Sequence, residues 1–258
     1  MRQTGLWLIA ICFALIGCDE SNQNGTYEDE PDSGVAMVDA TAEVDVGPGQ
    51  EVTYGIGYRE DEYSYESALF EGTRRIPIQI WYPTTDEAGL EALYRGAFIR
   101  PDVFENADVA LTEAAPVLIF SHGRRAYGQA SYFMNEYFAS RGWISVSLDH
   151  PGDGPLDGAE LPEIYGARPL DISAVIDYMQ ALPADHPLTG LVSPGIALAG
   201  HSFGGYTTLA VAGADYAVES WRVRCAEEGT GGFCTHFREH EPLFQQGFSD
   251  PRIGVAIP

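Results

Sequence analysis

Alternating polar and apolar residues mark the start of the folded part of the chain. This period of two, typical of half-buried β-strands, runs over residues 52–58 and again over 75–82. Two such runs in succession predict an antiparallel pair of strands. Pro77 lies inside the second run and has no N–H to give to a sheet, so we expect a sheet edge or a bulge at that position.

Longer apolar runs further along the chain predict buried strands that alternate with helices. The runs cover residues 116–120, 143–148, 196–199 and 252–257. Between them, one helix is predicted over 129–140 and a second with Asp171 in its first turn. The second helix has apolar residues spaced i, i+3, i+4 and i+7, which are Ile172, Val175, Ile176 and Met179. This order of elements predicts an α/β fold with a mostly parallel sheet and flanking helices.

The segment Gly200-His201-Ser202-Phe203-Gly204-Gly205 follows one of these strand-like runs and precedes a stretch rich in Ala, Leu and Val. A strand, a sharp turn and a helix form the setting of a G-x-S-x-G nucleophile elbow, which exposes the serine hydroxyl above the end of a parallel sheet. We expect no room for a Cβ at Gly200 or Gly204, because strand and helix approach closely there. Ser202 is therefore the candidate nucleophile. A Gly-rich turn that contains a serine by chance is the alternative.

The N-terminus has the pattern of an export signal. Arg2 precedes an apolar run over 6–16, which is too short to span a bilayer and has the charged-then-apolar order of a secretory signal. The run ends in Leu15-Ile16-Gly17-Cys18, which resembles a bacterial lipobox. Residues 1–17 are therefore predicted to be a cleaved signal peptide, and Cys18 the lipidated N-terminus of an exported lipoprotein on the periplasmic or cell-surface side of a membrane. An ordinary signal peptide with an incidental cysteine is the alternative.

Composition separates a tether from a globular domain. Residues 18–50 are rich in acidic residues, Gly, Ser, Asn and Pro and contain no basic residue, so a disordered tether is expected before a domain over 51–258. The whole chain has a formal net charge of -24, and all 14 of its basic residues are arginine. Such an acidic surface repels nucleic acid, so we expect no nucleic-acid partner.

Residues 214–249 have weak periodicity and are predicted to be an insertion that forms a lid or wall over the active-site end. Cys225 and Cys234 form an isolated pair within it, and in an exported protein such a pair predicts a disulfide that contributes on the order of 2 to 3 kcal/mol. Zinc is the competing interpretation, because His236 and His240 stand nearby at i, i+4 spacing. The spacing does not match the common zinc motifs, so no metal is expected.

Four motifs together carry a family resemblance. They are Ser121-His122-Gly123, Asp149-His150-Pro151-Gly152, Arg168-Pro169-Leu170-Asp171-Ile172 and the elbow. In order and spacing over residues 52–258 they resemble bacterial α/β-hydrolases, and most of all the group called predicted dienelactone hydrolases, which is related to platelet-activating factor acetylhydrolase. True dienelactone hydrolases use a cysteine nucleophile. The serine at position 202 instead favours carboxylic ester substrates.

The resemblance implies the parts of an esterase site. The backbone N–H groups of Phe203 and Arg124 would form the oxyanion hole, and an acyl-Ser202 intermediate would need neither metal nor organic cofactor. The substrate would be a small-molecule or lipid ester. In α/β-hydrolases the catalytic acid and histidine follow later strands. Since Pro258 comes after only one further predicted strand, the resemblance implies a domain without its last strands, acid and histidine.

Other polar residues near the predicted site have structural interpretations. His201 is expected to pack beneath the turn. His122 and His150 are expected to brace loops by donating to backbone carbonyls. Arg124 and Arg125 are expected to form an exposed pair, with recognition of an anionic substrate group as the alternative.

Three alternatives remain open. His236 or His240 is a candidate base inside the chain, with Asp215 or Asp250 as its acid. A binding protein that kept the elbow but lost catalysis is a second possibility, and a peptidase of the same fold is a third. A further catalytic Asp and His would count against the binding protein. Turnover of esters rather than peptides would count against the peptidase.

Overall fold

The computed structural model describes residues 53–70, 72–157, 162–228 and 231–258. The predicted signal peptide (1–17), Cys18 and the predicted tether (18–50) lie outside these residues. Within the described ranges, the structure contains no helix long and apolar enough to cross a membrane.

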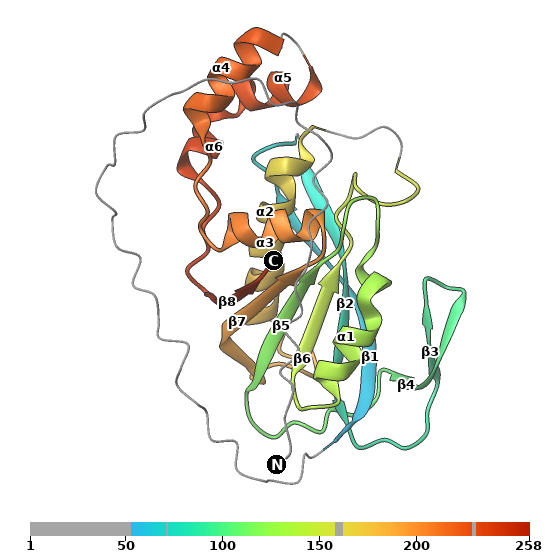
Figure 1. The fold of residues 1–258 in the computed structure, drawn as a ribbon. Coiled ribbons are helices and arrows are strands. Elements are labelled where there is room, and N and C mark those ends of the chain that lie inside the picture. The colour runs from blue at the N-terminus through green and yellow to red at the C-terminus, as the bar shows by residue number, and fades with distance from the viewer. Residues whose placement is uncertain (1–52, 71, 158–161, 229–230) are drawn as a thin grey trace, which may run out of the picture. The chain divides into compact units, whose positions relative to one another are not determined.

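One eight-stranded sheet organises the described part of the domain, in the order β3-β4-β1-β2-β6-β5-β7-β8 (Figure 1). Neighbouring strands among β5, β6, β7 and β8 run parallel, whereas β1–β2 and β2–β6 run antiparallel. The predicted α/β class with a mostly parallel sheet and flanking helices is confirmed. The strands are β1 (Gly55–Glu66), β2 (Thr73–Thr84), β3 (Glu91–Tyr94), β4 (Phe98–Glu105), β5 (Ala115–Ser121), β6 (Ile144–Leu148), β7 (Val192–Gly200) and β8 (Ile253–Ile257).

Helices cover both faces of the sheet. α1 (Tyr132–Ala139) packs through Met134 and Phe138 on the face of β5 and β7 that carries Leu118, while the apolar stripe of α2 (Ile164–Gln180) is buried against the opposite face. α3 (Phe203–Val211) follows β7 and also contributes to the α2 side. Because helices cover both faces, the central strands read as continuous apolar runs.

The segment after α3 is helical. It contains α4 (Val218–Glu228), α5 (Gly232–Glu239) and α6 (Glu241–Gln246), which pack on one another (Figure 1). These helices lie within the predicted insertion, whose weak periodicity gave no sign of them. They bury their own small core of aromatic rings around the Cys225–Cys234 pair.

Pro77 is not on an edge strand, so that prediction was wrong. β2 pairs with β1 on one side and with β6 on the other. The β6 ladder begins at Ile78, one residue after the proline, and the Pro77 carbonyl still accepts from the Asp149 N–H at 3.0 Å. Proline is tolerated because it stands just outside the part of the strand whose N–H groups the ladder needs.

The second predicted helix begins earlier than expected. α2 starts at Ile164, so Asp171 is not in its first turn and Pro169 lies inside the helix. An interior proline leaves the carbonyl four residues before it without a donor, which here is that of Tyr165. The Tyr206 hydroxyl donates to this carbonyl at 2.6 Å. A side chain from α3 thus supplies the hydrogen bond that the proline cannot.

Candidate active site

The turn between β7 and α3 places Ser202 at an exposed, strained position. Its backbone has φ 56° and ψ −115°, a left-handed conformation that is costly for a residue with a side chain. A Cβ on Gly200 would lie 2.1 Å from the Gly204 carbonyl oxygen, and one on Gly204 would lie 1.9 Å from that of Ser121. The predicted lack of space at both glycines is confirmed.

The loop after β5 lies directly against this turn. The His201 N–H donates to the Ser121 carbonyl at 3.2 Å. A Cβ on Gly123 would stand 3.5 Å from the Ser202 Cβ. The two segments that carry the predicted oxyanion donors therefore meet beside Ser202. Phe203 is the first residue of α3, where a backbone N–H has no acceptor within its own helix.

His122 fixes the direction of the peptide that follows it. Its Nδ1 is 2.6 Å from the Gly123 carbonyl oxygen, and its Nε2 accepts from the His150 N–H at 3.2 Å. Burial, together with His150 and Arg168, lowers the pKa of His122 to about 2, so the ring is neutral and Nδ1 carries the proton. In a trans peptide the C=O and N–H point to opposite sides. The Arg124 N–H thus points away from the His122 ring.

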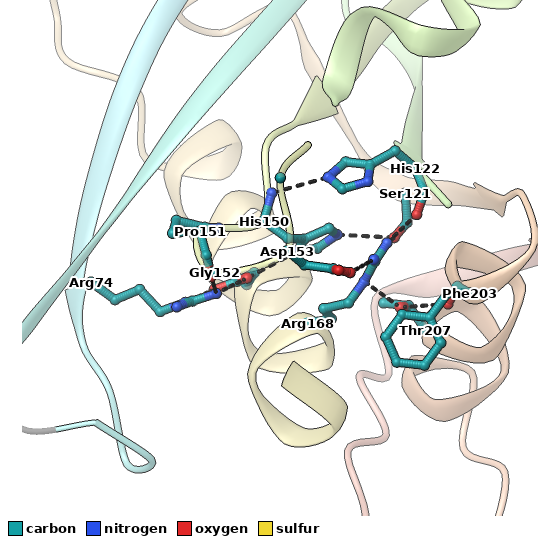
Figure 2. A network of polar contacts seen from close by, with 12 residues as sticks. Arg74, Ser121, His122, His150, Pro151, Gly152, Asp153, Arg168, Phe203 and Thr207 are labelled. Atoms are coloured by element: carbon teal, nitrogen blue, oxygen red, sulfur yellow. Dashed lines mark hydrogen bonds and ion pairs between the residues drawn. The ribbon is translucent and has the colours of Figure 1, made fainter. Parts of the chain in front are cut away.

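Arg168 lies buried at the centre of a polar network behind the loop, as Figure 2 shows. Its Nη1 pairs with Asp153 at 2.5 Å, and its Nη2 donates to Ser121 Oγ at 3.0 Å and to the His122 carbonyl. Its Nε donates to Thr207 Oγ1 at 3.2 Å. Burial lowers the pKa of Arg168 to about 10, so the guanidinium stays charged at neutral pH.

This network connects the loop to the helix that follows Ser202. Thr207 is in α3, and its hydroxyl donates in turn to the Phe203 carbonyl at 3.1 Å. The guanidinium carbon of Arg168 also lies 4.9 Å from the centre of the Phe203 ring. A single buried cation therefore touches both segments that carry the predicted oxyanion donors.

A second array, Ser121, His150 and Asp171, has the connectivity of a catalytic triad but no access to solvent. Ser121 Oγ is 3.0 Å from His150 Nε2, and His150 Nδ1 is 2.9 Å from Asp171 Oδ2. Because the Arg168 guanidinium can only donate, the Ser121 proton is directed to His150. Burial, followed by the positive charges of Arg168 and Arg74, holds the pKa of His150 well below its ordinary value. Ser121 is buried and cannot reach a substrate.

Asp171 anchors the far end of this array. Its carboxylate accepts two hydrogen bonds from Arg74, at 2.6 and 2.9 Å, and one from the Tyr65 hydroxyl at 2.9 Å. The prediction that both histidines donate to backbone carbonyls holds for His122 and was wrong for His150. Sequence reasoning missed the roles of Arg74, Arg168 and Asp171, although all of them except Arg74 stand in the quoted motifs.

Two surface predictions at the site were also wrong. His201 does not pack beneath the turn; it is exposed, and a Cβ on Gly123 would lie 3.2 Å from its Nδ1. Arg124 is half-buried rather than exposed, because its guanidinium lies 4.9 Å from the centre of the Phe203 ring. Arg125 is exposed, as expected, and its backbone N–H donates to Asp153.

The residues considered as an alternative base and acid have no hydrogen bond to Ser202 in the described part of the chain. His236 is buried against the ring of Phe244, at 5.9 Å between centres, and 4.6 Å from the ring of His240. The Asp250 carboxylate is paired with Arg252 at 2.6 Å, while Asp215 is exposed. In the part of the chain that the structure describes, no hydrogen bond joins Ser202 to a histidine.

Cys225 and Cys234 form the predicted disulfide, with an S–S distance of 2.07 Å and a Cα–Cα distance of 5.3 Å. The bond joins α4 to α5, and both cysteines are buried. Their sulfur atoms are therefore not available as thiolate ligands. Across the described ranges there is no group of three or more His, Cys, Asp or Glu side chains placed to hold a metal ion.

Comparisons with known proteins give a distant structural match. No family model matches the chain. No curated protein matches it either. Among solved structures, it is similar to a ferulic acid esterase from Streptomyces cinnamoneus, with 20% sequence identity and a TM-score of 0.49. The match covers 63% of this chain and 56% of that esterase, so the chain spans little more than half of that protein's length.

Proposed function

We propose that this protein is a serine hydrolase that cleaves carboxylic esters through an acyl-enzyme on Ser202. The observation that carries the proposal is the strained, exposed Ser202 between β7 and α3, with the loop after β5 packed against it. A positive φ at a non-glycine residue is costly, and such strain is concentrated at functional positions. Arg95, Asp102, Asn106 and Arg125 also have positive φ, so the proposal depends on the strain at Ser202 together with its exposure and the loop packed against it.

The chemistry follows from the atoms around this serine. Ser202 Oγ attacks the ester carbonyl carbon and gives its proton to a general base, while the carbonyl oxygen becomes an oxyanion. The N–H groups of Phe203 and Arg124 stabilise that charge, each by about 3 kcal/mol. Collapse of the intermediate expels the alcohol, which takes the proton, and leaves the acyl group on Ser202. Water then releases the acid by the same steps.

His122 and Arg168 act as positioning residues in this proposal. His122 holds the Gly123 carbonyl, and with it the opposite N–H of Arg124. Arg168 binds the His122 carbonyl and, through Thr207, the first turn of α3. Oxyanion donors contribute most when they need no reorganisation during the reaction. A buried network of this kind provides that rigidity.

The general base is proposed from outside the Ser121–His150–Asp171 array, because that array has no access to substrate. The family resemblance implies an acid and a histidine after further strands. Inside the chain, His236 and His240 are the candidates. The substrate is proposed to be a small-molecule or lipid ester, met at a membrane to which a lipid on Cys18 would hold the protein.

The test is reaction of the purified protein with a fluorophosphonate probe and turnover of p-nitrophenyl butyrate. Ser202→Ala is expected to abolish both, whereas Ser220→Ala, which changes an exposed serine of α4, is the matched control and should change neither. Labelling of another residue would show that Ser202 is not the nucleophile. No labelling and no turnover in a form of the protein that also carries the further Asp and His would favour the binding-protein alternative. Faster release of p-nitroaniline from a peptide anilide than of nitrophenol from the ester would favour the peptidase.

A further inference from the structure

A cavity of about 360 Å³ lies between α3 and the helical segment that follows it. Its walls come mainly from five aromatic side chains: Tyr165, Tyr206, Tyr216, Trp221 and Phe233. We call it the aromatic pocket. Nothing in the proposed chemistry of Ser202 uses it. Its volume falls in the range of small-molecule sites, which are typically apolar with few polar groups.

The aromatic pocket begins close to the candidate nucleophile. Tyr206 and Leu209 are spaced i and i+3 on α3 and both line the pocket, and Ser202 directly precedes the first residue of that helix. Phe203, directly after the serine, stacks on Tyr206 with ring centres 5.0 Å apart and contacts Tyr165 at 5.1 Å. At 1.5 Å per residue, the lining positions on α3 lie roughly 6 to 12 Å along the helix from Ser202.

Two tyrosine hydroxyls of the pocket wall already have hydrogen-bond partners within the protein. The Tyr206 hydroxyl donates to the Tyr165 carbonyl at 2.6 Å and lies 2.7 Å from the Tyr216 hydroxyl. Burial raises the pKa of Tyr216 to about 12 and that of Tyr206 further, so both phenols are neutral. With their hydroxyls bonded to protein, these residues present ring carbon to the cavity.

Charge around the aromatic pocket argues against an ionic ligand. The exposed Asp215 at its lining disfavours a carboxylate or phosphate. Arginines already lie over the aromatic faces, with the Arg124 guanidinium 6.0 Å from the Tyr165 ring and that of Arg224 5.4 Å from the Trp221 ring. An ammonium group would meet these like charges. An uncharged apolar group meets no such opposition.

We propose that the aromatic pocket binds the uncharged apolar group of the ester, because Tyr206 and Leu209 of its lining lie on α3, the helix that begins directly after Ser202. The inference rests on the proposed function and adds the substrate class to it. Esters with an extended aliphatic or aromatic acyl group are then preferred over acetyl esters. Only the longer group reaches the pocket, where its apolar surface is buried away from water.

Binding is tested first, without catalysis. The uncharged fluorophore N-phenyl-1-naphthylamine is titrated into the purified full chain. Ala214→Trp places a bulky ring in the pocket lining and is expected to weaken binding about tenfold. Ala212→Trp, at an exposed alanine two residues away that does not line the pocket, is the matched control and should leave binding unchanged. Equal affinity in both variants would overturn the proposal.

A second variant guards against misfolding of the first. Leu209→Glu puts a carboxylate at a half-exposed lining position, which needs no repacking, and is expected to weaken fluorophore binding by a similar factor. Thermal unfolding followed by circular dichroism establishes that each variant is folded. If Leu209→Glu is folded and binds the fluorophore as the wild type does, this contradicts the proposal as strongly as equal affinity in Ala214→Trp and Ala212→Trp would.

Turnover then separates this inference from the proposed function. With p-nitrophenyl acetate, butyrate and octanoate, we expect kcat/KM to rise at least about tenfold along the series. Ala214→Trp should remove the rise, whereas Ala212→Trp, outside the pocket lining, should keep the rise and leave acetate turnover unchanged. Ser202-dependent turnover without a chain-length effect would refute the role of the aromatic pocket and support the proposed esterase function. If Ala214→Trp weakens fluorophore binding but the protein turns over no ester, the aromatic pocket is supported as an apolar binding site and the proposed esterase function is refuted.

Discussion

The imidazole of His122 holds the Gly123 carbonyl oxygen at 2.6 Å, on the side of the peptide opposite to the Arg124 N–H. The ring cannot move freely, because its other nitrogen accepts from the His150 N–H and the whole residue is buried. A histidine that touches neither Ser202 nor a substrate thus sets the direction of one proposed oxyanion donor. The relationship can be tested by kinetics.

His122→Ala is expected to lower kcat for p-nitrophenyl butyrate by roughly tenfold to a hundredfold, because complete loss of one oxyanion donor costs 10²- to 10³-fold. KM should change little, since the ground-state ester does not depend on that donor. His122→Asn is the matched variant, because its Nδ2 stands at the position of the lost Nδ1 and should restore part of kcat. If His122→Ala and His122→Asn lose the same amount of kcat and the same amount of thermal stability, a positioning role for His122 is contradicted.

Arg168 should be far more important for stability than an exposed arginine. Arg168→Met leaves Asp153 buried without its partner, which is expected to cost about 3 to 5 kcal/mol in the free energy of unfolding. Arg75→Met is the control, because the Arg75–Glu62 pair is exposed and should contribute at most about 1 kcal/mol. Urea unfolding of the two variants measures both values. Similar losses in the two variants would show that the network does not support the fold.

The site was partly predictable from sequence because its key turn is local. The strand-like run, the glycines and Ser202 stand within a dozen residues, and the crowding at Gly200 and Gly204 follows from strand and helix meeting there. Arg168 carries no local signal of its role. It contacts Ser121 and Thr207, 47 and 39 residues away, and only the fold brings these together.

The fold shows the same division between local and distant causes. Central strands were predictable from continuous apolar runs because both faces of the sheet are covered. The start of α2 was not, because Pro169 indicates a helix boundary and its effect on the Tyr165 carbonyl is offset by a hydroxyl from Tyr206 on another helix. The short β3–β4 hairpin was missed as well, since its four-residue strand is too brief to show a period.

Stability should fall as the pH is lowered below about 6.5. In the folded protein His122 and His150 stay neutral, with the pKa of His122 at about 2 and that of His150 well below its ordinary value. In the unfolded chain both take up a proton near pH 6.5, so the unfolded state binds more protons and stability is lost progressively between pH 6.5 and about 2.

Each buried histidine should contribute about 1.4 kcal/mol per pH unit to that loss. Urea unfolding at several pH values between 4 and 6 gives the slope for the wild type. His122→Gln removes one titrating group and should reduce the slope by about 1.4 kcal/mol per pH unit. An unchanged slope in this variant would mean that His122 is protonated in the folded protein.

Anchoring through Cys18 is the prediction that lies furthest from the described residues. Expression with Cys18→Ser should move the protein from the membrane fraction to the soluble fraction, because stable attachment needs the acyl chains that only this cysteine would carry. Cys12→Ser, within the apolar run of the predicted signal, is the control and should not alter the distribution. An unchanged membrane fraction in Cys18→Ser would refute the lipoprotein interpretation.

The disulfide should stabilise the helical segment that carries part of the aromatic pocket. Cys225 and Cys234 close a short loop between α4 and α5, and Trp221 on α4 and Phe233 on α5 line the pocket. A loop of this length contributes about 2 to 3 kcal/mol in the chain-entropy account. The double variant Cys225→Ser, Cys234→Ser should therefore bind N-phenyl-1-naphthylamine more weakly and lose stability, and a reductant should do the same to the wild type but leave the variant unchanged. Intact fluorophore binding after reduction, verified by thiol titration, would show that packing of the aromatic rings alone holds the pocket together.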